Sequence, residues 1–182
     1  MERVRSEVIF QLYILLLAIP LVKIIESVSE QPNYNSVSRF IILLLFAVEW
    51  IYSQARLKPD YASRVHNITV LLLETAVCVL IAFAAYQMNS EIRYYRLILY
   101  FLSADLILQS ISLFFGQGQM LKVTKSWIRH DLLEAGFFFF GLIAIKFDVL
   151  NDYYRSTILV IVVVWSTLRN FYRNHTFYFS EK

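Results

Sequence analysis

Cysteine, proline and glycine are scarce in this chain. Their scarcity excludes disulfides and cysteine metal sites, and makes frequent helix breaks unexpected. The one cysteine, Cys78, can form neither an internal disulfide nor a multi-cysteine metal site. Four glycines and three prolines leave few points at which a helix would be interrupted. Gly-x-Ser-x-Gly, His-Glu-x-x-His and glycine-rich phosphate loops are all absent, so we expect neither catalytic activity nor a bound cofactor. An acid-based intramembrane enzyme needs none of these motifs, and nothing in the sequence supports one.

Apolar residues dominate what is present. They make up 58% of the 182 residues, and the mean hydropathy is +0.55, which is more apolar surface than a water-soluble domain of this length could cover. Apolar segments separated by short polar breaks recur, each about the 17 to 25 residues that a membrane-spanning helix needs. They cover residues 7–27, 39–55, 65–87, 94–115, 127–147 and 154–172.

The sequence therefore predicts an all-α fold, a polytopic membrane bundle of about six helices. The six segments occupy nearly the whole chain, and the longest connections are QARLKPDYASR and GQGQMLKVTKS. We expect residues 1–182 to form a single integral membrane domain with no soluble domain. Residues 39–51 resemble 96–107, and 66–74 resemble 130–134, so a parallel repeat of helical hairpins is one hypothesis and chance similarity is the other.

Basic residues indicate the orientation of the bundle. With six spans, both termini lie on the side that also holds the connections after the second and fourth segments. Most of the lysines and arginines gather on that side, and the positive-inside rule then places both termini in the cytoplasm. We expect a multi-pass protein of the cell membrane, in contact with lipids. The sequence offers no basic surface with interleaved aromatics for nucleic acid.

Carboxyl groups inside the apolar segments are the candidate functional residues. A charge there costs about 2.5 to 3.5 kcal/mol on insertion scales, so such residues are expected to have a function. A helical rise of about 1.5 Å per residue places Glu74 and Asp105 near the middle of their segments. Gln109 follows Asp105 on the same helical stripe. No basic residue lies at that depth, and we expect these three residues to form a midplane ion or proton site.

A second group lies in the cytoplasmic third of the predicted bundle. It comprises Glu49, His130, Asp131, Glu134 and Arg169. Arg169 is the expected counter-charge for Glu134 or Glu49, because an ion pair relieves much of the cost of a charge in the membrane. His130 and Glu134 have the spacing of a metal-binding pair, but two ligands do not make a site, and we expect no metal. A haem between His66 and His130 would lack any attachment motif.

Two functions fit these features. The first is an ion or proton channel, or a transporter-like protein, that works as a homo-oligomer because six short helices enclose little volume. The second is a non-catalytic sensor or assembly subunit acting with a soluble cytoplasmic partner in signalling or defence. It would present residues 56–64 and 115–126 and the aromatic C-terminal segment as docking surfaces.

Overall fold

The computed structural model describes residues 11–18, 22, 25, 29, 33–64, 68–115 and 118–174. The side chains of residues 52–69, 71, 112 and 114–120 lie outside this description. Every regular element among the described residues is a helix, so the all-α prediction is confirmed. A helical segment at 11–18 precedes α2 (Tyr34–Arg64), α3 (Ile68–Tyr86), α4 (Glu91–Phe115), α5 (Gly118–Phe147) and α6 (Asp152–Arg173).

Two helices, α2 and α5, extend well beyond their predicted segments. The predicted segment 39–55 is the centre of α2, which continues to Arg64 through the expected connection QARLKPDYASR. The predicted segment 127–147 is the end of α5, which begins nine residues earlier at Gly118. Apolar content locates the core of a helix, whereas polar residues with good helix propensity, such as lysine, arginine and glutamine, extend it.

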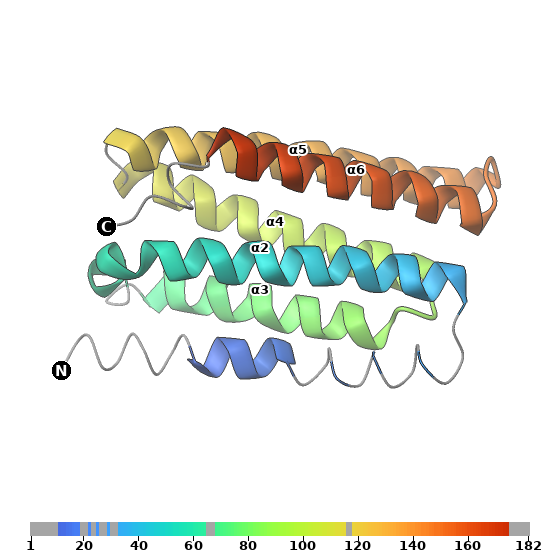
Figure 1. Cartoon of the computed structure of the whole chain (residues 1–182), viewed down its shortest axis with the longest axis horizontal. Coiled ribbons are helices and arrows are strands. Elements are labelled where there is room, and N and C mark those ends of the chain that lie inside the picture. Colours follow the sequence, from blue (N-terminus) through green and yellow to red (C-terminus); the bar gives the residue numbers. More distant parts are fainter. Residues whose placement is uncertain are drawn as a thin grey trace.

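The helices run antiparallel along one long axis (Figure 1). Helices α2, α4 and α6 point one way, and α3 and α5 point the other way. Helices α5 and α6 form one edge of the bundle, α2 and α4 lie in the middle, and α3 with residues 11–18 forms the other edge. Helix α4 packs most extensively on α5 and α3, while α2 packs chiefly on α6 and much less on α3. The two predicted hairpins are therefore packed differently.

Asparagine side chains cap the N-terminal ends of α2 and α6, which pack against each other. Asn33 Oδ1 accepts the backbone N–H of Ser36 at 2.8 Å before α2. Asn151 Oδ1 accepts the N–H of Tyr154 at 3.0 Å at the start of α6. Such caps satisfy backbone donors that have no partner inside the helix. They set where each helix begins, and hence the depth of the polar residues that follow along it.

An apolar layer of aromatic and aliphatic side chains fills the centre of the bundle. Phe46 of α2 lies 5.2 Å from Phe101 of α4 and 6.2 Å from Phe138 of α5, measured between ring centroids. Tyr95 meets Phe138 edge-on at 5.5 Å, and its ring lies against Gly141, where an added Cβ would come within 2.8 Å of Tyr95 Cε2. The other members of this central layer are Ile42, Leu43, Ile98, Leu102, Leu159 and Val163.

Helix α6 turns its polar side inward and its apolar side outward. Leu159 and Val163 are buried, but most of the buried face is polar: Arg155, Ser156, Ser166, Thr167 and Asn170. The exposed face is largely aromatic and aliphatic, with Tyr153, Tyr154, Ile158, Ile161, Trp165, Leu168 and Tyr172. This is the reverse of the pattern of a helix on the surface of a water-soluble protein.

Length and hydropathy alone single out one described segment as able to cross a membrane. Residues Tyr34–Ile51 of α2 form an 18-residue window of mean hydropathy 1.4, and 44% of that window is buried inside the structure. Leu72–Tyr86 is also apolar but shorter. A buried core helix of a soluble protein can pass the same test, so the six-span membrane bundle stays a prediction.

Candidate functional site

Four carboxyl groups and an imidazole converge between α2, α4 and α5. We call this group the acidic cluster, and it consists of Glu49 of α2, Asp105 of α4 and His130, Asp131 and Glu134 of α5. Glu134 is completely buried, and the side chains of Glu49 and His130 are about nine-tenths buried. The structure therefore gathers acids that are far apart in sequence into one enclosed space.

His130 connects two of these acids. Its Nε2 atom lies 3.1 Å from Glu49 Oε2 and 3.5 Å from Glu134 Oε1. Glu134 follows His130 by four residues on α5, a spacing that places both side chains on one face of the helix. A protonated imidazole would offset one negative charge and leave the others in excess.

Asp105 and Asp131 share a donor. Gln109 Nε2 donates to Asp105 Oδ2 at 2.8 Å and to Asp131 Oδ2 at 2.5 Å. The shared donor makes the two carboxyl groups neighbours. A hydrogen bond between two carboxyl groups needs a proton on one of them, because two carboxylates can only accept. A proton on either carboxyl group would allow a direct hydrogen bond between Asp105 and Asp131.

Helix α6 supplies neutral donors from its buried face. Ser166 Oγ donates to Glu134 Oε1, and Asn170 Nδ2 donates to Glu49 Oε1. Thr167 Oγ1 donates to Glu49 Oε2 at 3.3 Å. Among the described residues, the hydrogen-bond partners of the four acids are amides, hydroxyls, His130 and one another. Neither lysine nor arginine pairs with them in this part of the chain.

Two buried oxygens in or next to the acidic cluster have no hydrogen-bond partner among the described residues. They are Glu134 Oε2 and Gln109 Oε1. His130, Asp131 and Glu134 also present ligand atoms that all lie within 4.8 Å of one another. The cluster has spare capacity for a proton donor or a cation, because a buried polar atom without a partner costs free energy.

A pocket of about 330 Å³ lies between α5 and α6 beside the acidic cluster. We call it the α5–α6 pocket. Three arginines line it, Arg129, Arg169 and Arg173, and all three are exposed. His130, a member of the acidic cluster, and Ser166, which donates to Glu134, line it too. The remaining lining residues are Ser126, Leu133, Trp165 and Asn170.

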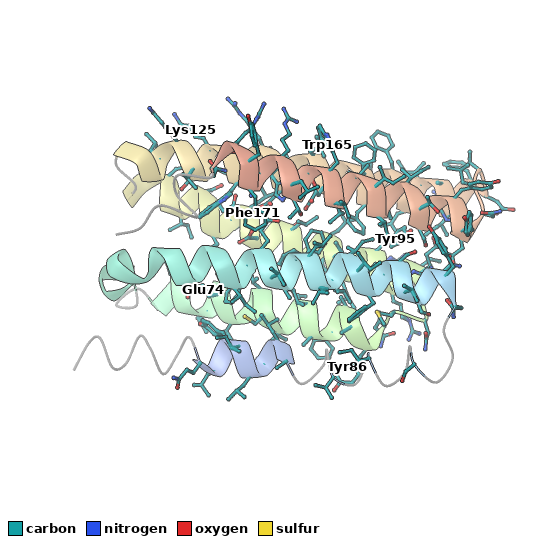
Figure 2. The ribbon with its side chains drawn as sticks, viewed as in Figure 1. Glu74, Tyr86, Tyr95, Lys125, Trp165 and Phe171 are labelled. Carbon is teal, nitrogen blue, oxygen red and sulfur yellow. The ribbon has the colours of Figure 1, made fainter. Side chains whose placement is uncertain are left out.

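Glu74 lies among different neighbours from those of Asp105. It is buried on α3, near Tyr13 and Cys78, and Figure 2 shows it in the α3 layer, away from the edge that carries Trp165. The sequence placed Glu74 and Asp105 together as a midplane pair. Asp105 instead meets Asp131, because α5 begins well before the predicted segment and Asp131 lies 13 residues into it.

Arg169 also differs from its expected role. Its guanidinium lies 4.9 Å from the centroid of the Trp165 ring, on the exposed side of α6. Ser166 and Asn170 occupy the buried face, and one residue of helix turns a side chain by about 100°. Among the described residues, His130 and not Arg169 is the basic side chain beside Glu49 and Glu134. His66, the other residue of the haem hypothesis, lies outside the described residues.

Near the other end of the bundle the buried charges are paired. Arg155 of α6 forms a bidentate pair with Glu91 of α4, with both N···O distances 2.7 Å. Arg39 of α2 donates to Asp152 at 2.5 Å and to the backbone oxygen of Met88 at 2.7 Å. We call Arg39, Glu91, Asp152 and Arg155 the paired network. The sequence did not identify it, although each arginine lies at the start of an apolar segment and both acids are predicted on that side.

Comparisons with family models, curated proteins and solved structures found no match for this chain.

Proposed function

We propose that this protein is a multi-pass membrane protein that binds protons in the acidic cluster and transfers them in a transporter-like cycle. The observation that carries the proposal is four enclosed carboxyl groups without a lysine or arginine partner among the described residues. Intramembrane acids of this kind mark proton relays and ion pathways in membrane proteins. A set of acids that lacks fixed positive partners needs mobile ones, and protons are the smallest.

The reversed pattern of α6 supports a membrane location. Ile161 and Leu168 are 62% and 64% exposed, while Ser166 and Thr167 are each 3% exposed. In water this arrangement would expose apolar side chains and hide hydroxyls, whereas in lipid it is the favourable one. Exposed aromatics at Phe139, Phe140 and Phe147 of α5 continue the same apolar surface. We retain the predicted orientation, with the α5–α6 pocket on the cytoplasmic side.

Access to the acidic cluster favours protons over metal cations. The pocket beside the cluster is lined by Arg129, Arg169 and Arg173, whose charges oppose the entry of any cation. A metal ion would have to pass them whole, whereas a proton can be transferred from group to group. His130 forms part of the pocket wall and also contacts Glu49. An imidazole nitrogen can both accept and donate a proton, so His130 can pass a proton from the pocket to the carboxyl groups. This gives His130 the role of relay and the acids the role of proton store.

The central apolar layer argues for a transporter rather than an open channel. On α2, Ile42, Leu43 and Phe46 lie between Arg39 and Glu49, and all three are at least 97% buried. Glu49 follows Arg39 by ten residues, which is ~15 Å along the helix axis. A proton could cross this layer only if helices move or if a second copy of the chain completes the path, so the predicted homo-oligomer remains part of the proposal.

Proton flux into liposomes tests this function. We expect wild-type protein in vesicles with an internal pH-sensitive dye to carry protons when a pH gradient is imposed. Asp105→Asn with Asp131→Asn should abolish the flux, because the shared proton is lost. Glu74→Gln is the matched control, since it neutralises a buried acid outside the cluster. Absence of flux in wild-type vesicles, or equal loss in the control, would contradict the proposal.

The sensor hypothesis rests on surfaces that are not described. The side chains of residues 56–64 and 115–120, and residues 175–182 altogether, lie outside the described part of the chain. Residues 121–126 of the second docking surface form part of α5. No described contact favours a soluble partner, so this alternative stays a prediction.

A further inference from the structure

The three arginines of the α5–α6 pocket have no part in the proton relay. Arg169 and Arg173 are four residues apart on α6, and Arg129 directly precedes His130 on α5. Among the described residues, no carboxylate pairs with any of them; the recorded ion pairs involve Arg39, His130 and Arg155. Three unpaired guanidinium groups on one pocket of about 330 Å³ make a concentrated positive site.

The chemistry of the pocket suits a phosphate group. Guanidinium presents a planar fork of N–H donors that matches phosphate oxygens in two-point hydrogen bonds. Ser126 lines the same pocket, and its Oγ accepts from Asn174 Nδ2 at 3.2 Å, which leaves its own O–H to donate elsewhere. A phosphomonoester carries about 1.5 to 2 negative charges at neutral pH, so three arginines would more than balance it.

The surroundings of the pocket favour a lipid as the source of that phosphate. Trp165 lines the pocket and is 52% exposed, and Figure 2 shows it on the outer edge of the bundle. Exposed Leu168 and Ile161 continue the apolar face of α6. A headgroup in the pocket would let its acyl chains lie along this face. Tryptophan at such a position is typical of the membrane interface.

We propose that the α5–α6 pocket binds the phosphate headgroup of an anionic phospholipid through Arg129, Arg169 and Arg173. The proposal rests on the membrane location given above and is independent of proton transfer. Basic pockets between membrane helices on the cytoplasmic side are known to hold lipid headgroups. The bound phosphate would offset the arginine charges at the mouth of the acidic cluster, beside His130.

Lipid binding by the purified full-length chain tests the proposal. We would measure binding of phosphatidic acid and of phosphatidylcholine to the protein in detergent by native mass spectrometry. Arg169→Gln with Arg173→Gln should weaken phosphatidic acid binding by about tenfold or more, because two of three phosphate ligands are lost. Lys122→Gln with Lys125→Gln is the matched control. It removes the same charge from exposed positions of α5 at the same end of the bundle, outside the pocket.

Each outcome supports or overturns lipid binding in the α5–α6 pocket. Selective binding of phosphatidic acid, lost in the arginine variant and kept in the lysine variant, supports the proposal. Equal loss in both variants would show general surface attraction and overturn it. Inorganic phosphate displacing the lipid at equal concentration would indicate a free-anion site and also overturn it. Should the arginine variant misfold, wild-type protein that binds both lipids equally well would still contradict the proposal. Because the readout is binding, a failure of proton flux leaves it unaffected.

Discussion

The paired network and the acidic cluster are both buried and polar, but they balance charge in opposite ways. The paired network sets two arginines against two carboxylates. The acidic cluster sets four carboxyl groups against one histidine. Both use α2, α4 and α6 as support, and about three turns of apolar side chains separate them. One bundle therefore holds one polar site with balanced charges and one in which carboxyl groups outnumber basic side chains.

This difference separates a structural role from a chemical one. In the paired network every charge has a fixed partner, so it joins helices and has no need to change its protonation state. In the acidic cluster the hydrogen bonds of α6 come from Ser166, Thr167 and Asn170, which are neutral. Such donors orient carboxyl groups but do not cancel their charge. Burial alone is thus a poor guide to function, and the partner of each acid is a better one.

Breaking the paired network should have the largest effect on stability. Arg155→Ala leaves Glu91 without its bidentate partner in a site where the two side chains are only 9% and 14% exposed. We expect a loss of about 3 kcal/mol, because an unpaired buried charge remains. Thermal unfolding of the purified protein would measure it. Glu134→Gln in the acidic cluster should cost far less, because the glutamine can still accept from Ser166 and His130 keeps its contact with Glu49. Equal losses in the two variants would contradict the distinction between the two sites.

Adding a methyl group to the packed central layer should have the next largest effect on stability. Gly141→Ala would bring a methyl group within 2.8 Å of the Tyr95 ring, which also packs on Phe138. We expect a loss of about 1 to 3 kcal/mol from overpacking. Gly136→Ala, five residues earlier on α5, meets nothing within 4 Å and is the matched control. If the control loses as much stability as Gly141→Ala, the close packing of this layer is not what the glycine serves.

Removing Arg169 should have the smallest effect. Its described contact is with the ring of Trp165, and an exposed cation–π contact contributes about 0.5 to 1 kcal/mol. Arg169→Gln should therefore lower stability by less than about 1 kcal/mol and leave proton flux intact. Unfolding and liposome assays on the same preparation would show this. A loss as large as that of Arg155→Ala would restore Arg169 as the counter-charge of Glu134.

The sequence predicted the helices better than it predicted their contacts. Apolar content located the five long helices, α2 to α6, because a buried or lipid-facing helix needs apolar side chains. Depth counted from the predicted segments grouped Glu49, His130, Asp131 and Glu134 correctly in space. It failed for Asp105, because depth depends on where α5 begins, and polar residues decide that start. It also cannot distinguish Arg169 from Asn170, whose sides of α6 are set by packing against α2 and α5.

Infrared spectroscopy of the carboxyl groups tests the central claim most directly. The account predicts a protonated-carboxyl band in the wild-type protein near neutral pH. That band should shrink in the Asp105→Asn, Asp131→Asn double variant and persist in Glu91→Gln, because the acidic cluster holds protons and the paired network does not. A band that is unchanged in the double variant, or lost in Glu91→Gln, would contradict the assignment of the acidic cluster as the proton site.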